Sequence, residues 1–127
     1  MERQLVKDLQ GAAKVKRAIV RSFDHRSVGA VHSLEPNLTT AVLVAGTAPL
    51  EPARLAEAAG AKLYGPDFQF LDEEQVRQLH AAGIRVVPWT VNEPADISRL
   101  LDWGVDGITT DVPDRLAGIL RERKIAF

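Results

Sequence analysis

The sequence predicts an α/β fold in which parallel strands alternate with helices. Three observations indicate this fold: short apolar runs rich in β-branched residues, helical patterns between them, and turn or capping residues at the boundaries. The centres of the runs lie about 20 to 24 residues apart, and strands that recur this regularly indicate right-handed crossovers in a parallel sheet. The expected strands are Arg17–Ser22, Thr40–Val44, Ala61–Tyr64, Arg85–Val91 and Gly107–Thr110.

Two helices can be placed from the pattern of their first residues. The start of the chain carries apolar side chains on one side and predicts a helix before the first strand. Further on, Asp72 and Gln75 form a capping box, and Leu71 and Val76 bracket it as a hydrophobic staple. These residues predict a helix over about residues 73–82, which a glycine then ends.

The last two helices are each preceded by a polar residue and a proline. Asn92-Glu93-Pro94 and Asp111-Val112-Pro113 put a capping side chain at the end of a strand and a proline in the first turn of a helix. An apolar stripe follows each of them and gives each helix one face for a sheet. The stripes are Ile97, Leu100 and Leu101, and then Leu116, Ile119 and Leu120.

The composition predicts one soluble globular domain that spans residues 1–127. The chain is 46% hydrophobic and 26% charged, and its formal net charge is -1. Without a broad basic surface, neither nucleic acid nor an anionic membrane is the expected partner. The absence of cysteine excludes disulfides, thiolate metal sites and thiol nucleophiles. The start does not resemble a secretion signal and no run is long enough for a transmembrane segment, so a cytoplasmic location is expected.

Two architectures fit a helix followed by five βα units. One is an open doubly wound sheet, which closes its core with this many units and would bind a small molecule at its strand ends. The other is part of a (β/α)8 barrel, which usually needs about 250 residues. Length alone favours the open sheet. In both cases the functional edge is formed by the carboxyl ends of the strands.

Two segments near the end of the chain resemble a known family. Val86–Asn92, which contains Trp-Thr-Val-Asn, and Gly104–Pro113, with Gly-Val-Asp-Gly-Ile-Thr-Thr-Asp-Val-Pro, are similar to the C-terminal part of the glycerophosphodiester phosphodiesterase family. Ser22-Phe23-Asp24, His80 and Gly83 lie at matching distances. The resemblance implies a partial TIM barrel, with about five of the eight βα units and one helix before them.

The same resemblance implies an activity in lipid metabolism. The family hydrolyses glycerophosphodiesters to glycerol 3-phosphate and an alcohol, with a divalent metal, Mg or Ca, and two histidines as acid and base. The family's His-Arg-Gly, Pro-Glu-Asn-Thr and Glu-x-Asp segments are missing from these residues, and His25-Arg26-Ser27 follows a strand rather than opening a barrel. We therefore expect no catalytic residue, no metal ligand and no cofactor bound by this chain alone, and no activity from it alone.

Four residues are the expected contacts to a glycerophosphodiester-type small molecule, should the barrel be completed. Trp89 lies near a strand's carboxyl end, where an indole can pack on glycerol; the alternative is a large core side chain. Asn92 and Asp111 end strands on the same side, although N-capping is the favoured interpretation of both. Asp24 could support acid or base chemistry, although a loop or capping role is favoured.

Other polar residues carry weaker alternatives. Asp24, Asp67 and Asp111 could hold Mg²⁺ or Ca²⁺ if the strand ends converge. His32 and His80 lie in helical patterns away from the strand ends, so a surface or packing role is expected for both.

An incomplete barrel exposes two strand edges. Their backbone groups lack partners, and interior apolar side chains are uncovered. We therefore expect a homo-oligomer formed through these edges. The alternatives to a half of an enzyme are a non-catalytic module that self-associates or binds another protein, and an open α/β binder of a small molecule.

Overall fold

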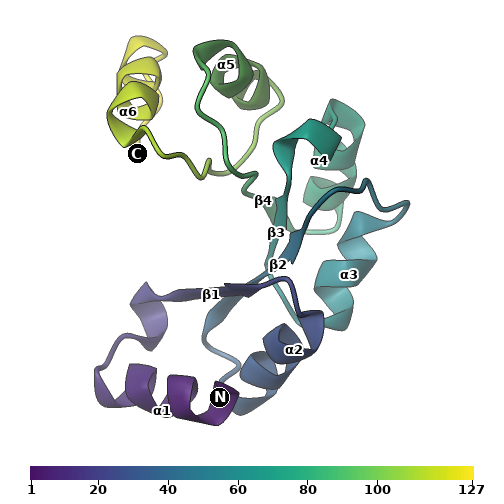
Figure 1. Ribbon diagram of the computed structural model, residues 1–127, viewed down its shortest axis with the longest axis vertical. Helices are drawn as coiled ribbons and strands as arrows, with labels where there is room; N and C mark the ends of the chain where they lie inside the picture. Colours follow the sequence, from purple (N-terminus) through teal and green to yellow (C-terminus); the bar gives the residue numbers. More distant parts are fainter.

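The computed structural model describes all residues from Met1 to Phe127 as a curved parallel sheet with helices on its outer side (Figure 1). The strands are β1 (Ile19–Ser22), β2 (Thr39–Val44), β3 (Leu63–Pro66) and β4 (Arg85–Val86). The α-helices are α1 (Glu2–Gly11), α2 (His25–Leu34), α3 (Pro52–Ala58), α4 (Glu73–Ala81), α5 (Pro94–Asp102) and α6 (Pro113–Glu122). Two short 3-10 helices are η1 (Val15–Arg17) and η2 (Phe68–Phe70).

The strands follow one another in the order β1-β2-β3-β4, and every neighbouring pair is parallel. A doubly wound sheet would reverse its strand order, so the open-sheet alternative is wrong. Figure 1 shows the helices in an arc around one side of the sheet, while its other side is open. This arrangement is that of an arc cut from a barrel.

The expected fifth strand is not a regular strand, and the fourth is much shorter than expected. Between them the chain makes isolated bonds: Thr109 N–H donates to the Pro88 oxygen, and Val91 N–H donates to the Thr109 oxygen, both at 2.9 Å. Pro66 on β3 has no N–H to donate to the Val87 oxygen, so regular pairing ends at Val86 and resumes as a single bridge between Asp67 and Trp89. Pro88 likewise has no N–H to donate toward the fifth segment.

The capping signals are correct for α4. Asp72 accepts a 2.8 Å hydrogen bond from the Gln75 N–H, and both staple residues, Leu71 and Val76, are buried. Gly83, which follows the helix, has a φ of 75°, a left-handed conformation that favours glycine. The helix therefore begins and ends where the sequence predicts.

The main core lies between the sheet and the outer helices. Alternate strand residues such as Val42, Tyr64 and Val86 point to this side, and Leu79 and Leu100 pack against them. A smaller cluster under α1 contains the buried residues Val6, Val31 and Leu38. By contrast, α6 has no buried residue. None of the helices has both the length and the apolar character needed to cross a membrane.

The opposite, concave side of the sheet is largely uncovered. It forms a cavity of about 240 Å³ lined by alternate residues of the strands and of the fifth segment. These residues are Ile19, Arg21, Ala41, Leu43, Leu63, Gly65, Val87 and Thr109. Ile19, on the edge strand, is 60% exposed. In a closed barrel this side would be the interior.

Candidate functional site

Two aromatic rings meet at the carboxyl ends of the strands. Trp89 is half-buried, and its indole Nε1–H donates a 2.9 Å hydrogen bond to the Gly65 oxygen. The ring of Phe23 packs edge-on against it, with centroids 5.6 Å apart and planes at 88°. The hydrogen bond and the contact with Phe23 hold Trp89 in place. Because Trp89 belongs to neither buried core cluster, part of its surface faces outward.

Phe23 is the residue that the sequence analysis missed as a site residue. It is 58% exposed, although it follows directly after β1. The alternation of side chains along the strand could have identified it. Ile19 and Arg21 face the concave side, so Phe23, two residues after Arg21, is expected on the same side at the strand's carboxyl end. Because it contacts the half-buried Trp89, the two rings together form one partly exposed aromatic surface at the strand ends.

Asn92 and Asp111 are brought together by direct hydrogen bonds. The Asn92 Nδ2 donates to Asp111 Oδ2 at 3.1 Å, and Asn92 Oδ1 accepts from the Asp111 N–H and the Thr110 hydroxyl, both at 3.0 Å. The capping role expected for both is wrong, because the N-cap residues of α5 and α6 are Glu93 and Val112. The amide of Asn92 instead joins the end of one strand segment to the next.

Asp24 is engaged by its own neighbour. It is the N-cap of α2, and its Oδ1 accepts from the Arg26 N–H at 3.0 Å, as the favoured capping interpretation predicts. Its second oxygen pairs with the Arg26 guanidinium at 2.9 Å. These hydrogen bonds, first from the Arg26 side chain and then from its backbone, lower the pKa of Asp24 from 3.8 to about 2. His25 turns away and bonds to the Leu43 oxygen through Nε2 at 2.9 Å.

A divalent metal does not fit the donors that this chain presents. No group of three His, Cys, Asp or Glu side chains is placed to hold an ion. Of the three carboxylates considered, Asp24 and Asp67 cap local turns and Asp111 bonds to Asn92. The three carboxylates expected as alternative ligands of Mg²⁺ or Ca²⁺ are therefore not gathered into one group in this chain.

The two helical histidines lie away from the strand ends, as expected. His80 Nε2 and Asp106 Oδ2 are 2.7 Å apart, and the same oxygen accepts from the Val86 N–H at 2.7 Å. This contact fastens the end of α4 to the segment after α5. His32 lies against Gly60, at the end of α3. Both side chains have packing or surface roles.

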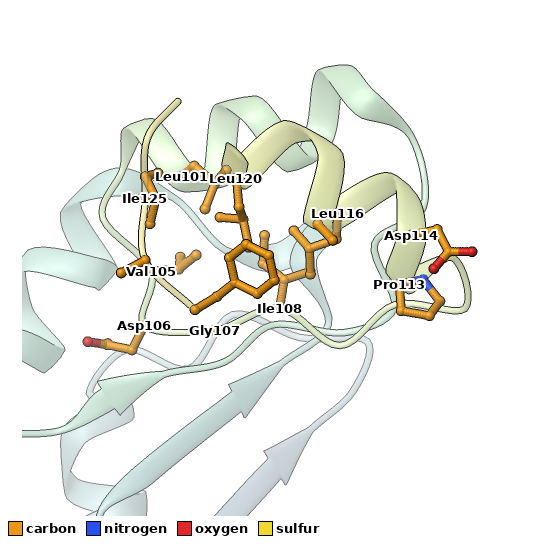
Figure 2. A pocket seen from close by; sticks show the side chains of 13 residues that line it. Leu101, Val105, Asp106, Gly107, Ile108, Pro113, Asp114, Leu116, Leu120 and Ile125 are labelled. Carbon is orange, nitrogen blue, oxygen red and sulfur yellow. The ribbon is translucent and has the colours of Figure 1, made fainter. Parts of the chain in front are cut away.

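An apolar cavity lies in the outer layer, away from the strand ends. It measures about 550 Å³ and is bounded by α5, α6 and the last three residues. Figure 2 shows Val105, Ile108 and Leu116 gathered around it, with the carboxylates of Asp106 and Asp114 at its margins, pointing outward. Its lining is mainly hydrophobic, and its acidic groups do not converge on one point.

The sequence matches the glycerophosphoryl diester phosphodiesterase family over residues 1–115. The glycerophosphodiester phosphodiesterase of Bacillus subtilis is 40% identical over 126 residues, which are 90% of this chain and 42% of that protein. The glycerophosphodiester phosphodiesterase of Bacillus altitudinis is 37% identical over 85% of this chain and 44% of that protein. The chain thus spans less than half the length of these two relatives.

Solved structures also indicate this family and cover this chain with about half of their own length. A candidate glycerophosphoryl diester phosphodiesterase from Silicibacter pomeroyi superposes with a TM-score of 0.92 and 30% identity, over 100% of this chain and 45% of that one. A glycerophosphodiester phosphodiesterase from Parabacteroides distasonis gives a TM-score of 0.86 at 25% identity, over 97% and 51%. These relatives are TIM barrels, of which this chain covers about half. The chain therefore belongs to the glycerophosphoryl diester phosphodiesterase family.

Proposed function

We propose that this chain is the C-terminal half of a glycerophosphodiester phosphodiesterase barrel, folded as a single α/β domain. In a completed barrel it would form one wall of a pocket for a glycerophosphodiester, and hydrolysis would give glycerol 3-phosphate and an alcohol. The acid, the base and the metal ligands would come from the rest of the barrel, so the chain alone would be inactive. A role in lipid metabolism follows from that substrate, and a cytoplasmic location stays a prediction.

The observation that carries this proposal is the Phe23–Trp89 pair at the carboxyl ends of the strands. TIM-barrel enzymes build their active sites at this end of the sheet. The two rings stand edge to face, and Trp89 is oriented by its bond to Gly65, so both surfaces are preorganised before any ligand arrives. Such surfaces suit the carbon atoms of a glycerol unit.

The polar part of the wall would come from Asn92 and Asp111. One hydrogen bond joins their side chains, and it uses only one of the two carboxylate oxygens of Asp111, which remains exposed. A free carboxylate oxygen can accept a bond from a substrate hydroxyl. Asp24 would act indirectly, because its carboxylate is held by Arg26 and fixes the turn that follows Phe23.

The proposal can be tested in a graft, defined as the Bacillus subtilis relative with its matched segment replaced by this chain. We expect the graft to release glycerol 3-phosphate from glycerophosphocholine when Mg²⁺ or Ca²⁺ is present, and the isolated chain to release none. A graft that unfolds cooperatively yet shows no turnover would contradict the proposal. So would chelator-sensitive turnover by the isolated chain, free of any full-length enzyme.

Self-association is the second candidate function. Two exposed apolar surfaces favour it, one on the edge strand β1 and one beside the apolar cavity near α6. Ile19 on β1 is 60% exposed, and Phe127 beside the apolar cavity is 74% exposed. Two copies could cover these surfaces for each other, or the surfaces could bind another protein. Light scattering over a wide range of concentrations tests this role, with Ile19→Lys as the variant expected to dissociate a dimer. A monomer at every concentration would exclude it.

A further inference from the structure

We propose that the missing part of the barrel places a carboxylate against Arg21 on the open concave face. The inference rests on the proposed function, because it takes the occupant of this face to be the remainder of a family barrel. It adds the chemistry by which the two parts recognise each other: a buried pair of Arg21 with an Asp or Glu on the neighbouring strand.

Arg21 lies on the concave side of β1, the edge strand of the sheet. Its neighbours in the cavity are mainly apolar and include Ile19 and Leu43. The guanidinium extends across the arc, and its Nη1 donates to the Thr109 hydroxyl at 3.2 Å. It thereby links the two open ends of the sheet, which are separated by 88 positions in the sequence.

The positive charge of Arg21 has no carboxylate partner in this chain. Arg26, Arg77 and Arg123, on outer surfaces, each form an ion pair, whereas Arg21 forms none. The strand register puts it in one row across the concave face with Ala41, Leu63 and Arg85. The only charges in this row are two arginines, and Arg85 also lacks an ion pair.

Closing the barrel would remove water from this guanidinium. An arginine does not lose its proton in proteins, so it cannot become neutral when it is buried. An unpaired charge among apolar side chains is strongly unfavourable, and a carboxylate is the protein group that matches a guanidinium with two parallel hydrogen bonds. The part that covers this face must therefore bring an anion to Arg21.

The position of Arg21 favours a carboxylate over a substrate phosphate. It lies within the strand, two residues before Phe23 at the strand end, and so below the expected pocket. The next strand of a completed barrel would lie beside β1, at the usual spacing of about 4.8 Å between neighbouring strands. An Asp or Glu there would reach the guanidinium directly.

The test compares Arg21→Met, Arg21→Lys and Arg21→Glu in the isolated chain and in the graft, by urea unfolding. In the isolated chain Arg21 is exposed, so Arg21→Met should change the folding equilibrium constant less than about threefold. In the graft the same change should lower it at least about tenfold, with Arg21→Glu more harmful and Arg21→Lys between. The matched control is Arg3→Met, an exposed position on α1 with no ion pair, which should be neutral in both.

The partner can then be found by changing each Asp and Glu in the host part of the graft to its amide. One of these changes should destabilise the graft with Arg21 and lose most of that effect with Arg21→Met. Equal effects of Arg21→Met in chain and graft, or no acidic position coupled to it, would overturn the proposal. Unchanged graft stability with a raised KM for glycerophosphocholine would assign Arg21 to the phosphate, and would also overturn it.

These outcomes are separate from those of the proposed function. A stable graft that shows the Arg21 coupling but no turnover would contradict the enzyme role and keep the carboxylate pair. A graft that turns over substrate without the coupling would do the reverse. If the graft does not fold at all, the concave face does not accept the rest of a family barrel, and both proposals are wrong.

Discussion

The indole of Trp89 donates a 2.9 Å hydrogen bond to the backbone oxygen of Gly65 on the neighbouring strand. Gly65 leaves little room there, because a Cβ on it would approach the Leu43 side chain to 2.6 Å. The absent side chain of Gly65 thus leaves room for Leu43 of β2, while its carbonyl accepts from the indole of Trp89 on the opposite neighbour. This contact sets the angle at which Trp89 faces the carboxyl ends.

Trp89→Phe should weaken substrate binding in the graft. The change keeps an aromatic ring but removes the N–H that orients it, and one lost hydrogen bond of about 1 kcal/mol corresponds to about a fivefold rise in KM. Steady-state kinetics with glycerophosphocholine measure this rise, and kcat should change less. The matched control is Trp103→Phe, the other tryptophan, which lies at the end of α5 beside Arg99 and should leave KM unchanged. Equal KM values for both variants would contradict a ligand contact at Trp89.

Asn92→Asp should destabilise the chain, and Asp111→Asn should restore it. The first change puts two carboxylates where a 3.1 Å hydrogen bond now lies, while the double variant regains one donor and one acceptor. For this partly exposed pair we expect a loss of about 1 kcal/mol from the single change. Urea unfolding at neutral pH measures it.

The control for this pair is Gln69→Glu, at an exposed position on η2 where only the backbone N–H forms a hydrogen bond. It should be close to neutral. If Asp111→Asn fails to rescue Asn92→Asp, the two side chains are not coupled in solution. The coupling matters for function because it holds two of the expected pocket residues in fixed positions.

Asp24 should titrate well below an ordinary aspartate. Its hydrogen bonds with Arg26 lower its pKa from 3.8 to about 2. Because the folded-state pKa is the lower one, the stabilisation is present above about pH 4 and is lost as the pH falls toward 2. Carboxyl-carbon NMR of the isolated chain measures the midpoint directly.

Arg26→Met should return the Asp24 midpoint toward 3.8. Arg54→Met removes a different exposed ion pair, with Glu51, and should leave Asp24 unaffected. A midpoint near 3.8 in the unchanged chain would show that the Arg26 bonds do not persist in water.

The helices could be predicted well because their signals are local. A capping carboxylate, a staple and a glycine within one or two turns determine where a helix begins and ends, and α4 follows them. The strand regions were also recognisable from their apolar runs. Pairing, however, depends on neighbours far along the chain: Pro66 on β3 has no N–H for the Val87 oxygen, and this interrupts a run that otherwise looks like one strand.

The candidate site was predicted only in part, for a related reason. Asp24 has its partners within two residues, so its capping role could be inferred. Asn92 looked like a cap because its nearest sequence neighbours suggested one, yet its partner Asp111 is 19 positions away. The roles of Phe23 and Arg21 could not be predicted until it was known which side of β1 faces the open, concave side of the sheet.

Thr40→Val should stabilise the chain. Thr40 is 1% exposed on the helix-facing side of β2, and its hydroxyl has no hydrogen-bond partner. A buried unpaired hydroxyl is unfavourable, whereas valine has nearly the same shape and no polar atom, so we expect a gain of about 1 kcal/mol in the free energy of unfolding. Urea or thermal unfolding measures it.

Thr39→Val is the matched control. Thr39 precedes Thr40 on β2, is half-buried and lies on the other face of the sheet, so this change should have little effect on the free energy of unfolding. A loss of stability from Thr40→Val, with Thr39→Val neutral, would show that the hydroxyl is hydrogen-bonded in solution, and that the outer side of the sheet admits water where the packing indicates none.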